Sequence, residues 1–197
     1  MRKKLYMLRH GQTRFNERHR IQGWCDAPLT ERGKRQAKIA KRYFAKNGIA
    51  FDRIVCSTSE RCSDTLELVT DLPYTRHHAL KEMDFGEFEG QPECLMPPVE
   101  LFPAYFARYG GETLEQVEAR VVAKIKEVME EEHTSVLCVT HGGVMRIFYA
   151  WLMGAKMRDE QDCDNCAVFE YDYDTDTKAF SFVQAVNHDF SGLEEEA

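Results

Sequence analysis

Two short apolar runs, each ending in a histidine followed by glycine, constrain the fold of this chain more than any other feature. The first covers residues 5–8 and leads into Arg9 and His10, and the second covers residues 135–140 and leads into His141. Short apolar runs bounded by charge or glycine are typical of buried strands in a parallel sheet. Ligands of open α/β sheets bind beyond the carboxyl ends of the strands, so neighbouring parallel strands would bring both imidazoles to one site.

A third apolar run adds a cation to the same sheet edge. Residues 51–56 form this run, and the helix expected after it carries Arg61 in its first turn. Two guanidinium groups, two imidazoles and a helix N-terminus suit a bound dianion, and a neutral imidazole is a nucleophile suited to phosphoryl transfer. The sequence therefore predicts a phosphate site that contains Arg9, His10, Arg61 and His141.

The remaining segments predict one α/β domain over residues 1–197. Helical spacing and capping residues predict helices over residues 30–47, 59–72, 113–131 and 142–152. Residues 75–80 read as a short strand, and the alternating runs 167–173 and 179–186 read as an antiparallel hairpin. We therefore expect a three-layer α/β/α sandwich whose mostly parallel sheet gains antiparallel strands at one edge.

Composition excludes several classes of partner. Lys and Arg number 26 against 33 Asp and Glu, a net charge of −7, which argues against a basic nucleic-acid-binding surface. No run approaches the roughly 20 apolar residues of a membrane span. The seven cysteines are odd in number and scattered, as in a reducing cytoplasm, where we expect this protein. Cys163 and Cys166 form a lone CxxC pair that we do not expect to bind metal or act in redox chemistry.

Residues 91–111, called the 91–111 segment below, break the periodic pattern. The segment holds four prolines among several aromatic residues. Long insertions in compact domains are usually lids or binding loops, which predicts a partly helical flap over the cleft. The alternative is a structural excursion that packs its aromatic rings on the body of the domain. The sequence leaves both interpretations open.

Six blocks in the chain resemble, in order and spacing, those of the histidine phosphatase superfamily in its phosphoglycerate mutase-like branch. The blocks are LRHGQTRFN (8–16), IQGWCDAPLTERGKRQA (21–37), STSERCSDT (57–65), EMDFGEFEG (82–90), GGET (110–113) and VTHGGVMR (139–146). The resemblance implies a phosphoglycerate mutase-like fold and a small phosphate ester as substrate. It also implies that His10 becomes transiently phosphorylated.

The phosphate ligands follow partly from the chemistry and partly from the resemblance. Arg9 and Arg61 would hold the phosphoryl oxygens and stabilise the charge that the transfer spreads over them. We expect His141 to be protonated when it faces the dianion, and the backbone N–H of Gly142 to donate at the start of its helix. The resemblance adds Asn16 as a further phosphate donor.

The leaving alkoxide needs a proton, which points to a carboxyl group near the nucleophile. The resemblance places this acid–base residue at Glu82, the first glutamate before the Phe-Gly pair, with Asp84 and Glu87 as nearby rivals. Gln22 and Gly23 match family positions that flank the substrate, and Gln22 could hydrogen-bond the organic part of the ester.

Three functions remain open. None of them requires a metal, and the phosphatase that we favour below requires no cofactor. A phosphomonoesterase lets water take the phosphoryl group from the histidine, whereas a cofactor-dependent phosphoglycerate mutase passes it to another hydroxyl. The resemblance implies that mutases are longer chains, with an arginine-rich segment before the second histidine. In this chain the 91–111 segment has a single arginine, Arg108, so we favour the phosphatase. The third possibility is a non-catalytic protein that binds a phosphorylated ligand. The sequence is compatible with a monomer or a homodimer.

Overall fold

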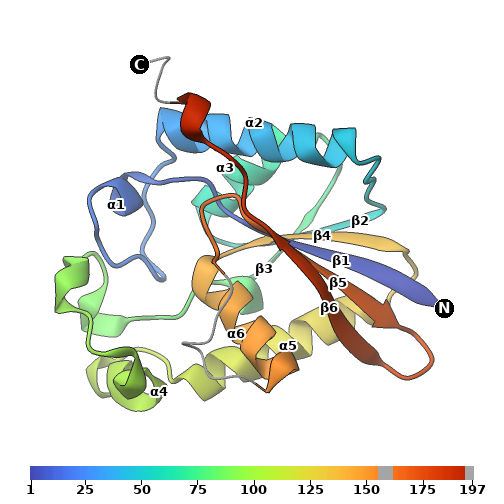
Figure 1. The fold of residues 1–197 in the computed structure, drawn as a ribbon. Helices are drawn as coiled ribbons and strands as arrows, with labels where there is room; N and C mark the ends of the chain where they lie inside the picture. The colour runs from blue at the N-terminus through green and yellow to red at the C-terminus, as the bar shows by residue number, and fades with distance from the viewer. Residues whose placement is uncertain (155–161, 194–197) are drawn as a thin grey trace.

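The computed structural model describes residues 1–154 and 162–193, and its centre is a six-stranded sheet (Figure 1). The strand order is β3-β2-β4-β1-β5-β6. The first four strands in this order are mutually parallel, β5 runs antiparallel to β1, and β6 runs antiparallel to β5. The strands are β1 (Arg2–Arg9), β2 (Arg53–Ser57), β3 (Thr75–His77), β4 (Ser135–Thr140), β5 (Val168–Asp174) and β6 (Ala179–Val186). The expected mixed sheet with an antiparallel hairpin at one edge is confirmed.

Helices cover both faces of the sheet and complete the three layers. On one face α2 (Glu31–Lys46) and α3 (Glu60–Val69) enclose an apolar cluster with the sheet, and the large cluster on the other face includes α5 (Leu114–Glu130) and α6 (Gly142–Met153). Figure 1 shows α2 and α3 on the side of the sheet opposite α5 and α6. The α/β/α sandwich is therefore confirmed. Among the described residues, no helix is long and apolar enough to cross a membrane.

Two predicted boundaries are wrong, and local chemistry explains both. The helix expected to reach residue 72 ends at Val69, because Thr70 adopts an extended conformation three residues before Pro73. The strand expected over residues 75–80 pairs with β2 only through His77, where β2 itself ends. Residues 78–80 then form a short 3-10 helix, which carries the Leu80 side chain into the core.

The 91–111 segment packs on the body of the domain through an aromatic cluster. The ring of Phe106 is fully buried, with centroids 4.9 Å from Phe85, 5.6 Å from Phe88, and 5.3 Å from both Phe102 and Tyr105. Besides residues 78–80, the short elements of the described chain are α1 (Arg14–Glu17), α4 (Phe102–Tyr105) and the 3-10 helices Gly86–Phe88, Glu93–Leu95, Val99–Leu101, Phe106–Tyr109 and Ser191–Leu193. This packing agrees with the structural interpretation of the segment, although the segment also lines the cavity described below.

Replacement of Phe106 should show how firmly this cluster holds the segment. Phe106→Ala removes a fully buried ring, so we expect the free energy of unfolding to fall by about 3–5 kcal/mol. Leu95→Ala is the matched control, because Leu95 lies in the same segment with 52% of its surface exposed and should cost less than about 0.5 kcal/mol. Urea unfolding followed by circular dichroism measures both. Equal losses in the two variants would contradict the buried position of Phe106.

Candidate active site

The carboxyl ends of β1 and β4 bring the two histidines together. The strands pair in parallel up to Arg9 opposite Thr140, and the backbone N–H of His10 then donates to the Thr140 carbonyl at 3.0 Å. As a result the ring centroids of His10 and His141 lie 5.4 Å apart in an edge-to-face arrangement. The juxtaposition expected from the two strand–histidine–glycine runs is present.

The surroundings of His10 leave it a neutral imidazole with one unprotonated nitrogen. Its Nδ1 lies 2.8 Å from the carbonyl oxygen of Gly11, which can only accept, so Nδ1 carries the proton and Nε2 keeps its lone pair. Burial, with only 4% of the residue exposed, and the nearby charges of Arg61 and Arg9 lower the pKa of His10 well below its ordinary value. Such an imidazole can attack phosphorus.

Arg61 lies beneath the site, with most of its donors already occupied. The residue is fully buried and is absent from the cavity lining. Its Nη1 donates to the Cys25 carbonyl at 3.0 Å and to Asp26 Oδ1 at 2.9 Å, while Nη2 donates to the Gly23 carbonyl at 2.8 Å. Nη2 also lies 2.9 Å from Nδ1 of His141, and only Nε has no partner within the described structure. Arg61 therefore supplies fixed positive charge beneath the site, and Nε is its one uncommitted donor among the described residues.

His141 is held between Arg61 and Ser57. A guanidinium can only donate, so Nδ1 of His141 must accept from Arg61, and Nε2 lies 2.8 Å from the hydroxyl of Ser57. Burial and the charge of Arg61 lower the pKa of His141 well below its ordinary value. These surroundings favour a neutral ring, and the protonation of His141 against a bound dianion stays a prediction.

Arg9, Asn16 and Gly142 line the cavity as donors. Arg9 lines the cavity and donates through Nη1 to the Cys163 carbonyl at 2.7 Å. Its Nε is buried and has no hydrogen-bond partner in the described ranges. Asn16 is the third residue of α1 and completes the capping box with Thr13: its Oδ1 accepts from the Thr13 N–H at 3.1 Å and from Asn165 Nδ2 at 3.3 Å, so its amide nitrogen remains for a ligand. The first residue of α6 is Gly142. Three donor groups from separate elements thus border one anion site beside His10.

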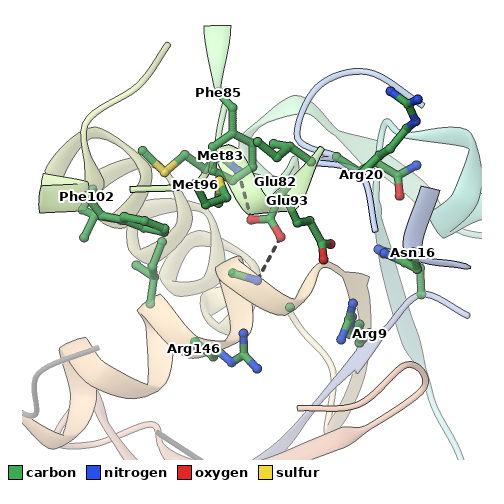
Figure 2. A pocket seen from close by; sticks show the side chains of 17 residues that line it. Arg9, Asn16, Arg20, Glu82, Met83, Phe85, Glu93, Met96, Phe102 and Arg146 are labelled. Carbon is green, nitrogen blue, oxygen red and sulfur yellow. Dashed lines mark hydrogen bonds between the residues drawn. The ribbon is translucent and has the colours of Figure 1, made fainter. Parts of the chain in front are cut away.

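Glu82 faces the same cavity and is held at the start of α6. Its Oε2 accepts from the N–H of Gly143 at 2.9 Å and its Oε1 from the N–H of Met83 at 3.0 Å, as the dashed lines in Figure 2 show. A Cβ atom on Gly143 would lie 2.4 Å from Oε1, so only glycine lets the carboxylate approach the helix this closely. The rivals Asp84 and Glu87 are absent from the cavity lining.

The structure separates the two predicted substrate-flanking residues. Gln22 lines the cavity, where its Oε1 accepts from the Thr13 hydroxyl at 2.7 Å and its buried Nε2 lacks a partner in the part of the chain described. Gly23 is absent from the lining: its N–H donates to Glu89, its carbonyl accepts from Arg61, and a Cβ atom would lie 2.1 Å from the Met83 carbonyl. Gly23 therefore packs beside the cavity and anchors Arg61, and its position next to the substrate stays a prediction.

The cavity itself measures about 360 Å³ and has a polar and an apolar part. Three charged residues that the sequence did not single out line it: Arg20, Glu93 and Arg146. Its apolar lining residues are Ile21, Met83, Phe85, Met96, Phe102, Leu114 and Ile147. Because Glu93, Met96 and Phe102 belong to the 91–111 segment, this segment forms a wall of the site as well as packing on the core. The volume suits a small metabolite.

Arg120 supports Glu82 from outside the cavity, and no motif pointed to it. Its guanidinium donates to the carbonyl oxygens of Ala79, Lys81 and Glu82 at 2.7–2.9 Å and forms a two-oxygen ion pair with Glu112. A hydrophobic pattern identifies α5 as a helix, but it cannot identify which polar residue on that helix reaches the site. Arg120 fixes the backbone from which Glu82 extends.

The fold and the site together define the class of protein: a three-layer α/β protein with paired histidines and arginines at the carboxyl edge of its sheet. Residues 5–185 match the family model of the histidine phosphatase superfamily, branch 1, and the chain belongs to this family.

Individual relatives include both phosphatases and mutases. The chain is 28% identical over 198 residues to the broad-specificity phosphatase YOR283W of Saccharomyces cerevisiae, covering 90% of this chain and 82% of that protein. It is 38% identical to the 2,3-bisphosphoglycerate-dependent phosphoglycerate mutase of Beijerinckia indica, but over only 92 residues, 44% of each chain. Among solved structures, Bacillus stearothermophilus YhfR superposes with a TM-score of 0.82 and 26% identity over 92% of this chain and 95% of that one.

The two neutral histidines predict a specific dependence of stability on pH. Their folded-state pKa values lie below the ordinary value, so the unfolded chain binds more protons than the folded chain once the pH falls below about 6.5. Above that pH both states hold neutral rings and the free energy of unfolding is unaffected by them. Below it the free energy of unfolding falls by up to about 1.4 kcal/mol per pH unit for each ring, because the unfolded chain gains protons that the folded chain does not. Urea unfolding between pH 7.5 and 5 measures the slope, and His10→Asn should remove one ring's share. An unchanged slope in that variant would contradict a neutral His10.

Proposed function

We propose that this protein is a metal-independent phosphomonoesterase that acts on a small phosphorylated metabolite through a phosphohistidine intermediate. The observation that carries the proposal is the unprotonated Nε2 of His10 in a cavity that also contains Arg9 and the carboxyl group of Glu82. A nucleophile, an anion-binding cation and a proton donor are the three groups that phosphate ester hydrolysis through a covalent intermediate requires.

The first half-reaction forms a bond between Nε2 of His10 and phosphorus and breaks the bond from phosphorus to the ester oxygen. The departing oxygen takes the proton of the Glu82 carboxyl group. Arg9, Asn16, the N–H of Gly142 and the buried charge of Arg61 stabilise the negative charge on the phosphoryl oxygens. In the second half-reaction water attacks phosphorus and gives a proton to Glu82, and the phosphorus–nitrogen bond breaks. Both residues return to their starting states.

A phosphoglycerate mutase is the second candidate, and the match to the mutase relative favours it. That match covers less than half of this chain, however, whereas the phosphatase relative matches over 90% of it. A mutase must also grip a carboxylate and exclude water, and the 91–111 segment carries a single arginine. These observations favour hydrolysis.

Phosphate release from a panel of phosphomonoesters in EDTA tests the proposal directly. We expect hydrolysis that survives EDTA, because arginine side chains and backbone N–H groups supply the positive potential at the site. The same samples should be assayed for isomerisation of 3-phosphoglycerate with added 2,3-bisphosphoglycerate. Isomerisation with little hydrolysis would establish the mutase, and phosphate release that EDTA abolishes would contradict metal independence.

A further inference from the structure

The cavity contains an acidic side chain, Glu93, that the proposed chemistry does not use. Figure 2 shows this side chain extending from the 91–111 segment into the cavity, in the direction of Arg9. In the proposed mechanism Glu82, which is held at the start of α6, already supplies the proton. A second carboxylate beside a dianion repels it, so its presence in a phosphate site needs an explanation.

Backbone pairing holds Glu93 in place. The N–H of Glu93 donates to the carbonyl of His19 at 2.8 Å, and the preceding Pro92 forms an antiparallel bridge with Arg20. One step further back, the N–H of Ile21 donates to the carbonyl of Gln91 at 2.8 Å. Residues 91–93 are therefore tied to the loop that follows α1, which makes Glu93 a fixed part of the cavity wall.

The carboxylate of Glu93 forms one weak, exposed ion pair among the described residues. This pair joins Oε2 of Glu93 to Nδ1 of His19 at 3.5 Å, and it is an ion pair only when His19 is protonated. The side chain of His19 is 85% exposed and that of Glu93 is 48% exposed. Exposed pairs of this kind contribute little. Arg20 also lines the cavity; its Nη1 donates to the Gly90 carbonyl at 2.7 Å, a hydrogen bond that leaves the positive charge of the guanidinium in place. The carboxylate of Glu93 is therefore available to a ligand.

We propose that Glu93 selects phosphate esters whose organic part carries an ammonium group, such as phosphorylated amino alcohols and hydroxy amino acids. This inference rests on the proposed phosphatase function and names its substrate class. With the phosphoryl group beside His10 and Arg9, the organic part of the ester extends into the rest of the cavity, where an ammonium group would meet Glu93. A neutral hydroxyl in the same place would leave this carboxylate without a charged partner, so Glu93 discriminates in favour of the ammonium ester.

Matched pairs of esters test the proposal, because each pair exchanges only an ammonium group for a hydroxyl. Phosphoethanolamine is compared with 2-hydroxyethyl phosphate, and O-phosphoserine with 3-phosphoglycerate, by kcat/KM for phosphate release. We expect the ammonium ester to be favoured by about tenfold or more in each pair, and Glu93→Gln to reduce each ratio by about tenfold, mainly through KM. Glu87→Gln is the control, since it removes the same charge from an exposed residue outside the cavity lining.

The outcomes separate this inference from the function on which it rests. If the wild-type protein hydrolyses these esters but Glu93→Gln leaves both ratios unchanged, Glu93 does not select the substrate. A uniform fall in kcat for all four esters would assign Glu93 a role in proton transfer and overturn the proposal as well. If the wild-type protein releases no phosphate from these esters or from p-nitrophenyl phosphate, the phosphatase function itself fails.

Discussion

His10→Ala should reduce phosphate release by at least about 10⁴-fold for every ester that the wild-type protein hydrolyses. The substitution removes the imidazole on which the proposed covalent intermediate forms, and removal of an enzyme nucleophile costs several orders of magnitude in kcat. The phosphorus–nitrogen bond of phosphohistidine survives alkali and is broken by acid. A reaction quenched in alkali should therefore yield ³²P-labelled wild-type protein and unlabelled His10→Ala.

The control for this substitution is His77→Ala. His77 lies on β3, contacts the hydroxyl of Thr75 at 2.9 Å and is absent from the cavity lining, so its loss should change activity less than twofold. Circular dichroism of both variants checks that the fold is intact. Retention of more than a hundredth of the wild-type activity by a folded His10→Ala protein would rule out a phosphohistidine mechanism, and label at another residue would identify a different nucleophile.

The sequence predicts the placement of the catalytic histidines because that placement depends on strand order and direction. Apolar runs define β1 and β4, and the motif after each run defines which residue lies at the sheet edge. The same reasoning extends to α2 and α5, whose first residues follow the capping threonines Thr30 and Thr113. Features that depend on periodicity and local capping are therefore accessible from sequence.

Features that depend on contacts between distant segments are not accessible in this way. The neutral state of His141 results from a hydrogen bond with Arg61, 80 positions away in the chain. Arg120 reaches Glu82 from α5, and Glu93 enters the cavity because the 91–111 segment pairs with the loop after α1. No local pattern encodes these contacts. The polar partners that tune the site are for this reason the part of the structure that sequence reasoning missed.

Glu82→Gln should slow the hydrolysis of alkyl phosphates by about 10²–10⁴-fold, because the variant has no acidic proton to give to the leaving oxygen. The effect should depend on the leaving group. p-Nitrophenol is a far stronger acid than an alkyl alcohol, so p-nitrophenolate can leave without protonation. With p-nitrophenyl phosphate the first half-reaction should stay fast while water attack is slowed. Rapid mixing should then show a burst of p-nitrophenol followed by a slow steady state, with phosphohistidine accumulating on His10.

Glu87→Gln is again the matched control, since it makes the same chemical change five residues away on an exposed side chain outside the cavity lining. It should leave both half-reactions within about twofold of wild type. The leaving-group dependence also separates proton transfer from structural damage. The Glu82 carbonyl accepts hydrogen bonds from the side chains of Trp24 and Arg120. A variant that merely distorted the backbone at this point would slow alkyl and aryl esters alike and would show no burst. An equal loss on both classes of ester would therefore reassign Glu82 to a structural role at the start of α6, and the proton donor would have to be sought elsewhere in the cavity.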